Sequence, residues 1–443
     1  MNTNIVLLNR NSQYCVFNFT TFQIFNISEH LYKLLEHLIK FGDNILTCTE
    51  YGIEPQELKT VLTQIGFIPN YVESAIDTKH SHKRDIVRIT LHVSNDCNLR
   101  CKYCYANGGA YNNTRSLMTR ETASRFVNYC CENFNSVENI VFFGGEPLLN
   151  PDIIKTVCQL FRIKYHKGEI SKLPKFGAIT NGTILTDEIY SLISEYFSFL
   201  TISVDGPKEI NDINRIYSDG TGSYNSVNKF IHRVKTIQGL KIGIESTFTK
   251  DHTDAGYSHS DIQKFFYSEY GLSADVIDEI TRDKEILISE DMEKPLESAW
   301  FHSFLGAIVR KQAVTKCDIL NSIIAVSVNG EIYPCHMNVG DGMKPVSSIW
   351  ESDTEIMDKI THHDNYKLKN SSVCLKCWAR NLCGGCSRSW YYNETTHNYS
   401  DKPNPDRCRE FRRIARLAVL KIAEIRKDKA MWENLLRHYN IKS

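Results

Sequence analysis

The stretch SNDCNLRCKYCYA, residues 94–106, places three cysteines close together, at Cys97, Cys101 and Cys104. It follows directly on IVRITLHVS, a β-branched run of the kind that forms a buried strand. Thiolates are soft ligands that suit zinc or iron–sulfur clusters. A structural zinc site needs four ligands, and no fourth Cys or His lies in this loop. Three thiolates on a four-iron cluster would leave one iron open for another molecule.

Strand-like and helix-like segments alternate from about residue 86 to residue 314. The predicted strands are residues 86–94, 139–145, 175–181, 199–206, 241–249 and 274–280, and the predicted helices include residues 119–134, 187–197 and 224–237. Six β/α units of this kind predict a parallel α/β sheet with right-handed crossovers, curled toward a barrel. Working residues gather at the carboxyl ends of the strands in such a fold. The cysteine triplet lies at such a strand end.

The two flanking regions have different patterns. Residues 1–80 begin with short β-branched runs and continue with two amphipathic helical patterns, which predicts a small sheet backed by helices. A polar linker is expected over residues 75–85. Residues 315–443 are rich in cysteine and loop-like to about residue 408, and they close with an amphipathic helical stretch at 411–439. Acidic residues are interspersed in this stretch, so we expect it to pack on its own protein rather than on a membrane.

Composition excludes several classes of protein. The chain has 443 residues, and its 52 Lys+Arg balance its 52 Asp+Glu, which argues against nucleic-acid binding. The first residues, MNTNIVLLNRNSQ, lack the uninterrupted apolar core of a signal peptide. Nowhere does an apolar run approach the roughly 18 residues of a membrane span. An odd total of 15 cysteines fits poorly with a disulfide framework, so we expect a cytoplasmic protein whose cysteines bind metal.

The cysteines divide into groups by position. Beyond the triplet, seven lie in the last third of the chain: Cys317, Cys335, Cys374, Cys377, Cys383, Cys386 and Cys408. The other five occupy apolar or amphipathic stretches and are expected to act as small buried hydrophobic residues: Cys15, Cys48, Cys130, Cys131 and Cys158.

The first cysteine loop resembles the signature of the radical S-adenosylmethionine (SAM) superfamily, C-x3-C-x-aromatic-C, with Tyr103 as the aromatic residue. Gly144-Gly145-Glu146-Pro147 resembles the superfamily's glycine-rich motif, whose backbone approaches the SAM amino group. The resemblance assigns SAM contacts to five more positions near strand ends: Thr180, Asn181, Ser203, Asp205 and, through its planar guanidinium, Arg215. Ordinary β-to-α turns also favour such residues, but here the motifs accompany the triplet in the expected order.

The resemblance implies a reaction and its cofactors. A [4Fe–4S] cluster on the triplet would chelate SAM through its open iron, and reductive cleavage would produce a 5′-deoxyadenosyl radical. That radical would abstract a hydrogen atom from a substrate. The cofactor carries this chemistry, while the protein orients the partners and excludes water. An electron donor such as flavodoxin or ferredoxin is implied.

The seven later cysteines resemble the SPASM extension of radical SAM enzymes that modify peptides and proteins, which holds two auxiliary [4Fe–4S] clusters. A zinc ribbon built from the CxxC pairs is the competing interpretation. One departure from the SPASM pattern is that Gly384-Gly385 put two residues, not three, before Cys386. By the family's interleaved pattern, the distal cluster would use Cys374, Cys377, Cys383 and Cys408, and the proximal cluster would use Cys317, Cys335 and Cys386. Full ligation of both clusters requires an eighth cysteine soon after the first, and residues 318–323 contain none, so the proximal cluster is expected to have an open iron.

Residues 1–80 resemble, more loosely, the winged-helix peptide-recognition element of maturases that act on ribosomally made peptides. In that element an exposed strand edge accepts a leader peptide as an added strand. A structural cap on the barrel is the alternative.

Together these resemblances imply a radical SAM peptide maturase that installs thioether crosslinks of the sactipeptide or ranthipeptide type. Its partner would be a ribosomally synthesised precursor peptide with a leader. A related possibility is an anaerobic sulfatase-maturating enzyme, which generates formylglycine and whose SPASM pattern supplies all eight cysteines. A metal-binding scaffold that only presents a peptide is the non-enzymatic alternative, and the intact triplet counts against it.

Overall fold

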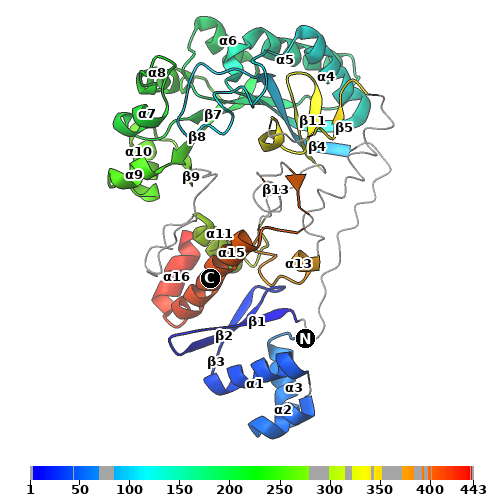
Figure 1. Ribbon diagram of the computed structural model, residues 1–443, viewed down its shortest axis with the longest axis vertical. Helices are drawn as coiled ribbons and strands as arrows, with labels where there is room; N and C mark the ends of the chain where they lie inside the picture. The colour runs from blue at the N-terminus through cyan, green and yellow to red at the C-terminus, as the bar shows by residue number, and fades with distance from the viewer. Residues whose placement is uncertain are drawn as a thin grey trace.

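The computed structural model describes residues 3–42, 44–68, 84–278, 299–314, 322–340, 344–351, 372–383, 392–393, 398–400, 402–439 and 441. A large sheet with its helices lies at one end of the molecule, and a small sheet with its own helices lies at the other (Figure 1). Helices near the C-terminus lie between the two sheets (Figure 1).

The six strands expected between residues 86 and 280 are present and pair in parallel, each with the next in chain order. Their bounds are β4 (Arg84–Ser94), β5 (Phe134–Gly144), β6 (Lys175–Thr180), β7 (Phe197–Ser203), β8 (Lys241–Phe248) and β9 (Ala274–Asp278). The α/β fold class is therefore confirmed. β9 forms one edge of the sheet, and the strands in the described residues curve without closing into a full barrel.

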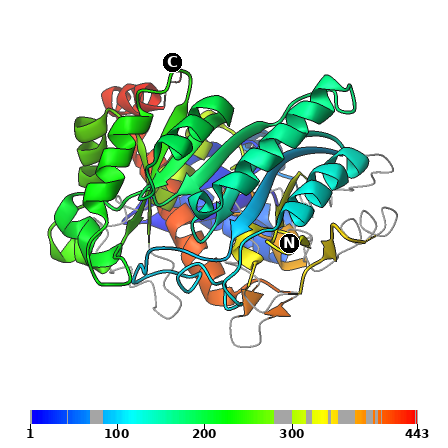
Figure 2. The same cartoon turned by 90° about the horizontal axis from the view of Figure 1, so that it is seen from above.

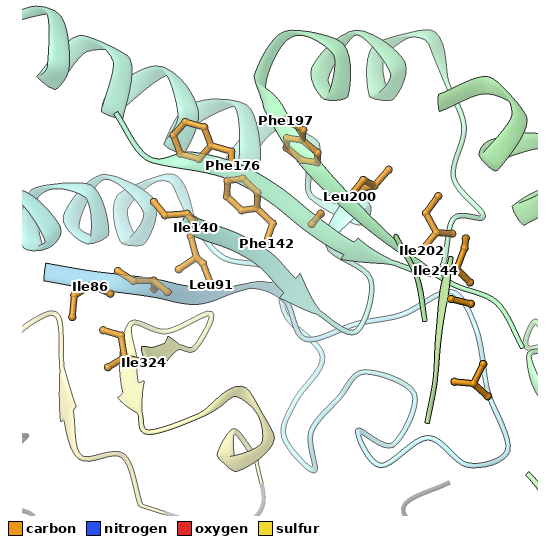
Figure 3. Packing of buried hydrophobic residues seen from close by; sticks show 14 of the residues in the cluster. Ile86, Leu91, Ile140, Phe142, Phe176, Phe197, Leu200, Ile202, Ile244 and Ile324 are labelled. Carbon is orange, nitrogen blue, oxygen red and sulfur yellow. The ribbon is translucent and has the colours of Figure 1, made fainter. Parts of the chain in front are cut away.

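Helices form an outer layer around the arc of strands (Figure 2). They are α4 (Arg120–Asn133), α5 (Pro151–His166), α6 (Asp187–Tyr196), α7 (Lys208–Asn214), α8 (Tyr224–Val234), α9 (Lys250–Asp254) and α10 (His259–Tyr270), with a 3₁₀ turn η1 (Pro147–Leu149) after β5. Leu91, Phe142 and Ile202 project from the strands into the apolar layer beneath the helices (Figure 3). Because successive side chains of a strand alternate between faces, the residues beside them face the concave side of the sheet.

Three short strands from the C-terminal region extend this sheet beyond β4, where the sequence had predicted only loops. β10 (Ile323–Val326) pairs with β4 in parallel, and β11 (Glu331–Tyr333) and β12 (Ser347–Ser348) follow in antiparallel order. Ile324 continues the apolar layer of the neighbouring strands (Figure 3). Strands of two to four residues are too short to give a clear period-two pattern, which is why the sequence alone missed them.

The N-terminal region forms the predicted small sheet with helices. It contains β1 (Ile5–Arg10), β2 (Gln13–Asn18), β3 (Gln23–Ile27), α1 (Glu29–Phe41), α2 (Asn44–Tyr51) and α3 (Pro55–Gln64). The strands pair antiparallel in the order β1-β2-β3, so β1 and β3 are the edges. Leu34, Leu35 and Leu38 of α1 pack on one face of this sheet.

The other face of the small sheet packs on α15 (Pro405–Ile425), which in turn contacts α11 (Ala299–Arg310) and α16 (Lys429–His438). Arg416 of α15 donates to Asn9 O at 2.5 Å, and Arg426 donates to Ile24 O at 3.1 Å. The expected packing of this amphipathic stretch on its own protein is confirmed, although it forms two helices, with Asp428 capping the second. Among the described helices, none has the length and apolarity that a membrane span requires.

The remaining described elements are short: η3 (His336–Asn338), α13 (Ser372–Leu375), β13 (Tyr392–Asn393) and β14 (Asn398–Tyr399). Cys317, Cys386 and most of the expected linker at 75–85 lie outside the described residues. Four of the five cysteines expected to serve as packing are buried, and Cys131 is partly buried: Cys15, Cys48, Cys130 and Cys158 are the buried ones.

Candidate active site

The loop that carries Cys97, Cys101 and Cys104 leaves the carboxyl end of β4, as predicted. All three thiols are free and partly buried. Two backbone bonds hold the loop against the end of α7 and the residues that follow it: Lys102 N donates to Asn214 O at 3.0 Å, and Arg100 N donates to Ile216 O at 2.7 Å. These bonds fix the middle of the triplet without using any cysteine sulfur.

The glycine-rich motif lets this loop pack backbone to backbone against the end of β5. Gly145 N donates to Ser94 O at 2.9 Å, and Glu146 N donates to Asp96 O at 2.8 Å. A Cβ on Gly145 would stand 2.3 Å from Asp96 O, and one on Gly109 would stand 2.6 Å from the Gly145 Cα. Gly144 and Gly145 were predicted to allow approach of SAM. In the structure they also allow the cysteine loop itself to close on the sheet.

Glu146 connects the ends of β5 and β6. Its fully buried carboxylate accepts from Leu148 N at 2.9 Å, from Thr180 Oγ1 at 2.7 Å and from Asn181 N at 2.7 Å. Burial raises the pKa of this carboxyl, which the three donors partly offset. The Asn181 amide in turn donates to the Cys97 sulfur at 3.6 Å. The structure therefore gives Glu146 a positioning role for Thr180 and Asn181, next to the first cysteine.

Tyr103, Asp205 and Arg215 form a hydrogen-bonded group under the cysteine loop. The Tyr103 hydroxyl donates to Asp205 Oδ2 at 2.6 Å and accepts from Arg215 Nη1 at 2.6 Å. Asp205 is fully buried, and its second oxygen accepts from Thr247 N at 3.1 Å. Ser203 is the half-buried last residue of β7, two positions before Asp205 in the sequence. These residues were predicted separately as SAM contacts, and the structure brings Tyr103, Asp205 and Arg215 into direct contact.

The residues of this site fit an iron–sulfur cluster with SAM. Cys97 Sγ accepts from Leu99 N at 3.3 Å as well as from Asn181, and such donors stabilise sulfur ligands. Burial raises the pKa of the Cys97 thiol to about 12, so cluster assembly must release its proton. Arg215 Nε is a buried donor with no acceptor in the part of the chain described here, and it is available to an anionic ligand.

A search of the described residues finds no group of three or more His, Cys, Asp or Glu side chains that converges on a single metal ion. A four-iron cluster has a different requirement, since its thiolates bind separate irons.

The later cysteines contact the main apolar core. Cys335, Cys374, Cys377, Cys383 and Cys408 are all partly buried against it. Cys377 N donates to Cys374 O at 3.1 Å, a tight turn within the CxxC pair, and Cys408 lies in the first turn of α15. The interleaved assignment of these ligands to two clusters stays a prediction, because two of the seven cysteines lie outside the described residues.

Four polar residues near or on the concave face escaped the sequence interpretation. Glu245 and Asp275 lie directly opposite each other on β8 and β9, and burial raises the pKa of Glu245. His92 on β4 is fully buried, and His336 follows Cys335. Each strand residue sits between two neighbours that face the helices, so strand alternation could have identified Glu245, Asp275 and His92. No local signal could have placed His336.

Comparison with known proteins agrees with this geometry. Residues 91–251 match the radical SAM superfamily. The chain is 23% identical over 410 residues to the radical SAM cyclopropyl synthase TigE of Paramaledivibacter caminithermalis, covering 82% of each chain. It is 24% identical over 328 residues to a cysteine-type anaerobic sulfatase-maturating enzyme of Clostridium perfringens, covering 67% of this chain and 87% of that one.

Solved structures share the fold. A structure of anSMEcpe with bound AdoMet has a TM-score of 0.57 at 20% identity and covers 76% of this chain and 99% of its own. Streptococcus suis SuiB bound to S-adenosylmethionine has a TM-score of 0.50 at 14% identity, covering 87% and 94%. With the cysteine loop and the glycine-rich motif placed on one sheet, residues 91–251 form a radical SAM domain, and the chain is similar to peptide-modifying and sulfatase-maturating enzymes.

Proposed function

We propose that the protein is a radical SAM peptide maturase that joins a cysteine sulfur to a carbon of an acceptor residue in a ribosomally made precursor peptide. One observation carries this proposal: the segment after β11, which contains Cys335, lies directly against the cysteine loop and its continuation to residue 118. Asn112 Nδ2 donates to Gly340 O at 3.4 Å, and Cys104 shares an apolar cluster with Val339. These contacts support the proposal that Cys335, a predicted auxiliary ligand, lies near the proposed site of SAM cleavage.

In this proposal Cys97, Cys101 and Cys104 hold the first cluster, and Arg215 pairs with the SAM carboxylate. A reduced cluster and SAM held by these residues would supply radical chemistry that abstracts hydrogen from the substrate. Tyr103 and Asp205 keep the Arg215 guanidinium oriented, and Asn181 donates to the Cys97 sulfur.

The seven C-terminal cysteines support a second part of the proposal, which is that the protein holds two auxiliary clusters. In the proximal cluster, one iron would be open to a thiolate of the substrate. The electron donor would be a flavodoxin or ferredoxin, and the compartment the cytoplasm. One structural neighbour offers a related precedent: anSMEcpe has been crystallised with bound AdoMet and the Cp18Cys peptide.

Leader binding is proposed for the edge of β3. The two-residue loop Asn11–Ser12, with φ of 44° and 61°, makes Arg10 and Gln13 a hydrogen-bonded pair. Because backbone groups alternate in direction along an antiparallel strand, those of Cys15 and Phe17 also point toward β1. Their partners on β3, Asn26 and Ile24, therefore point their backbone groups away from β2, toward the open side of β3. Arg426 bonds to the Ile24 carbonyl, in agreement with this count. An added peptide strand would pair with the outward groups of Asn26.

The test is anaerobic reconstitution followed by reaction. We expect about twelve irons per chain, which corresponds to three four-iron clusters. An iron content of about four per chain would contradict the two auxiliary clusters. The Cys97→Ala, Cys101→Ala, Cys104→Ala triple variant should form no 5′-deoxyadenosine, and unchanged formation would reject the radical assignment. The substrate should be the peptide encoded by the neighbouring short reading frame.

A cyclopropane product is the second candidate, favoured by the match to TigE over 82% of both chains. Both products lack about two hydrogens per modification, so mass alone does not separate them. Alkylation of the product with iodoacetamide separates the two. A thioether consumes the cysteine thiol and blocks alkylation, whereas a carbon–carbon bond leaves the thiol reactive. A modified peptide that still alkylates fully would overturn the thioether proposal and support the cyclopropane.

A further inference from the structure

A chain of aromatic rings crosses the concave face from the SAM-cluster loop to the Cys335 segment. The ring centroids of Tyr111 and His92 are 5.0 Å apart, those of His92 and Phe143 are 5.2 Å apart, and those of Phe143 and His336 are 5.0 Å apart. His336 Nδ1 lies 3.6 Å from Cys335 Sγ. The ring chain therefore ends at a cysteine sulfur.

Strand register builds this chain. His92 and Phe143 are direct partners on β4 and β5, and their neighbours Leu91 and Phe142 belong to the helix-side core, so both rings face the concave side. The parallel pairing of β10 with β4 then brings the segment after β11 over the same strands. Phe143 meets the His336 ring at an interplanar angle of 70°, an edge-to-face contact that restricts rotation of the imidazole.

His92 supports this arrangement as a neutral ring. It is fully buried, and within the described residues neither ring nitrogen has a hydrogen-bond partner. It therefore packs against Phe143 as an aromatic wall and places no charge behind the His336 ring.

Hydrogen bonds to cluster sulfurs are a principal control on reduction potential. Reduction adds negative charge to a cluster, and a donor to a ligating sulfur stabilises that charge. A neutral imidazole with its proton on Nδ1 would be such a donor at Cys335.

We propose that His336 donates a hydrogen bond from Nδ1 to the Cys335 sulfur and thereby raises the reduction potential of the auxiliary cluster that Cys335 holds. Phe143 and His92 keep the ring in the donating orientation. This inference rests on the proposed function, because it requires the proximal cluster. A higher potential makes that cluster easier to reduce, the direction needed of a group that receives an electron as the substrate is oxidised. His336 is a positioning and tuning residue here, not a catalytic one.

The test uses a redox titration followed by electron paramagnetic resonance. The parent is the full chain with Cys97, Cys101 and Cys104 changed to Ala, so that only auxiliary clusters contribute signals. His336→Phe keeps a ring against Phe143 and removes the donor. His336→Asn removes the ring and places an amide donor near the position of Nδ1. His166→Phe, at an exposed position on α5, is the matched control.

We expect His336→Phe to move the reduction equilibrium of one cluster about tenfold toward the oxidised form, which is 59 mV for one electron. In His336→Asn and His166→Phe, the reduction potentials of the auxiliary clusters should stay close to those of the parent. A His336→Phe protein with full iron content and the parent's potential would overturn the inference and leave the proposed function intact. Loss of about four irons in His336→Phe would also overturn it, since His336 would then be needed to hold the cluster. Absence of auxiliary signals in the parent would reject the proposed function itself.

Discussion

At the residue scale, Tyr103 has a structural function that its place in the cysteine motif does not reveal. Its hydroxyl donates to Asp205 and accepts from Arg215, each at 2.6 Å, so it joins a buried carboxylate to a buried guanidinium. Arg215 and Asp205 themselves are 3.5 Å apart, so the hydroxyl carries the shorter contacts. The orientation of Arg215, the proposed partner of the SAM carboxylate, therefore depends on the hydroxyl of a residue that lies between Cys101 and Cys104 in sequence.

Tyr103→Phe should consequently weaken both folding and SAM binding. Removing the hydroxyl leaves Asp205 Oδ2 buried without its donor, which costs about 1–3 kcal/mol. We expect SAM affinity to fall about tenfold, because Arg215 loses a fixing contact. Tyr217→Phe is the control, since it removes one hydroxyl bond, to Ser226 at 3.0 Å, outside the group. Equal losses in the two variants, in urea unfolding and in SAM binding, would contradict the prediction.

His92 provides a second residue-scale prediction, on the dependence of stability on pH. Burial lowers its pKa from 6.5 to about 3. Below about pH 6.5 the unfolded chain takes up a proton that the folded chain does not, so this histidine makes the protein less stable as pH falls. The slope is about 1.4 kcal/mol per pH unit in that range.

His92→Leu keeps a similar volume and removes the titrating group. The difference in unfolding free energy between variant and wild type should therefore move in favour of the variant as pH falls from 7.5 to 5, measured by urea titration under anaerobic conditions. His166→Leu, at the exposed position on α5, should follow the wild-type profile. Parallel profiles for His92→Leu and the wild type would show that His92 does not stay neutral in the folded protein.

At the scale of single elements, β3 combines a fixed position with an open edge. Asn26 Nδ2 donates to Ala423 O of α15 at 3.0 Å, and Arg426 bonds to the Ile24 carbonyl. These contacts hold β3 against the C-terminal helices while the backbone of Asn26 points to the edge. Deleting residues 1–80 would therefore uncover the apolar side of α15. Because that deletion changes more than the strand edge, a point substitution in β3 is the sharper test of leader binding.

Asn26→Pro removes the outward N–H that an added strand would use, at an edge position where proline is tolerated. We expect binding of a labelled synthetic leader, measured by fluorescence anisotropy, to weaken at least about tenfold. Asn26→Ala loses only the side-chain bond to α15 and should bind the leader as the wild type does. If both variants bind equally well, the small sheet serves as a cap and not as the recognition site.

At the scale of the whole molecule, one apolar core connects regions that are far apart in sequence. Leu8, Phe17 and Phe22 of the N-terminal sheet belong to the same cluster as the α15 side chains and the helix side of the large sheet. Phe17 meets Trp378 edge-on at 6.4 Å, and Asn381 Nδ2 donates to Phe19 O at 3.0 Å. The N-terminal sheet therefore supports the segment that carries Cys374, Cys377 and Cys383.

This connection predicts that a substitution near the N-terminus alters iron content. Phe17→Ala should cost about 3–5 kcal/mol and lower the iron retained by about four per chain, because Trp378 directly follows Cys377. Leu34→Ala is matched in burial but lies on the other side of the sheet, in the α1 cluster. It should cost about 2–5 kcal/mol and keep its iron. Equal iron content in the two variants, measured by colorimetric assay, would refute the coupling.

The sequence by itself determined the parallel β/α sheet, the strand ends that carry the cysteine triplet and the GGEP motif, and the small N-terminal sheet. These features depend on local properties: hydrophobic period, turn residues and ligand spacing, all of which are visible within about 15 residues.

Only the tertiary structure decided the rest. The pairing of β10 with β4, the Tyr103–Asp205–Arg215 group and the approach of His336 to the concave face each join residues separated by a hundred positions or more. A linear pattern does not encode such contacts, because they arise when the whole sheet buries its apolar layer and alternate residues are forced to the opposite face. The sequence thus identifies the candidate cysteine ligands, and the fold decides which polar and aromatic groups surround them.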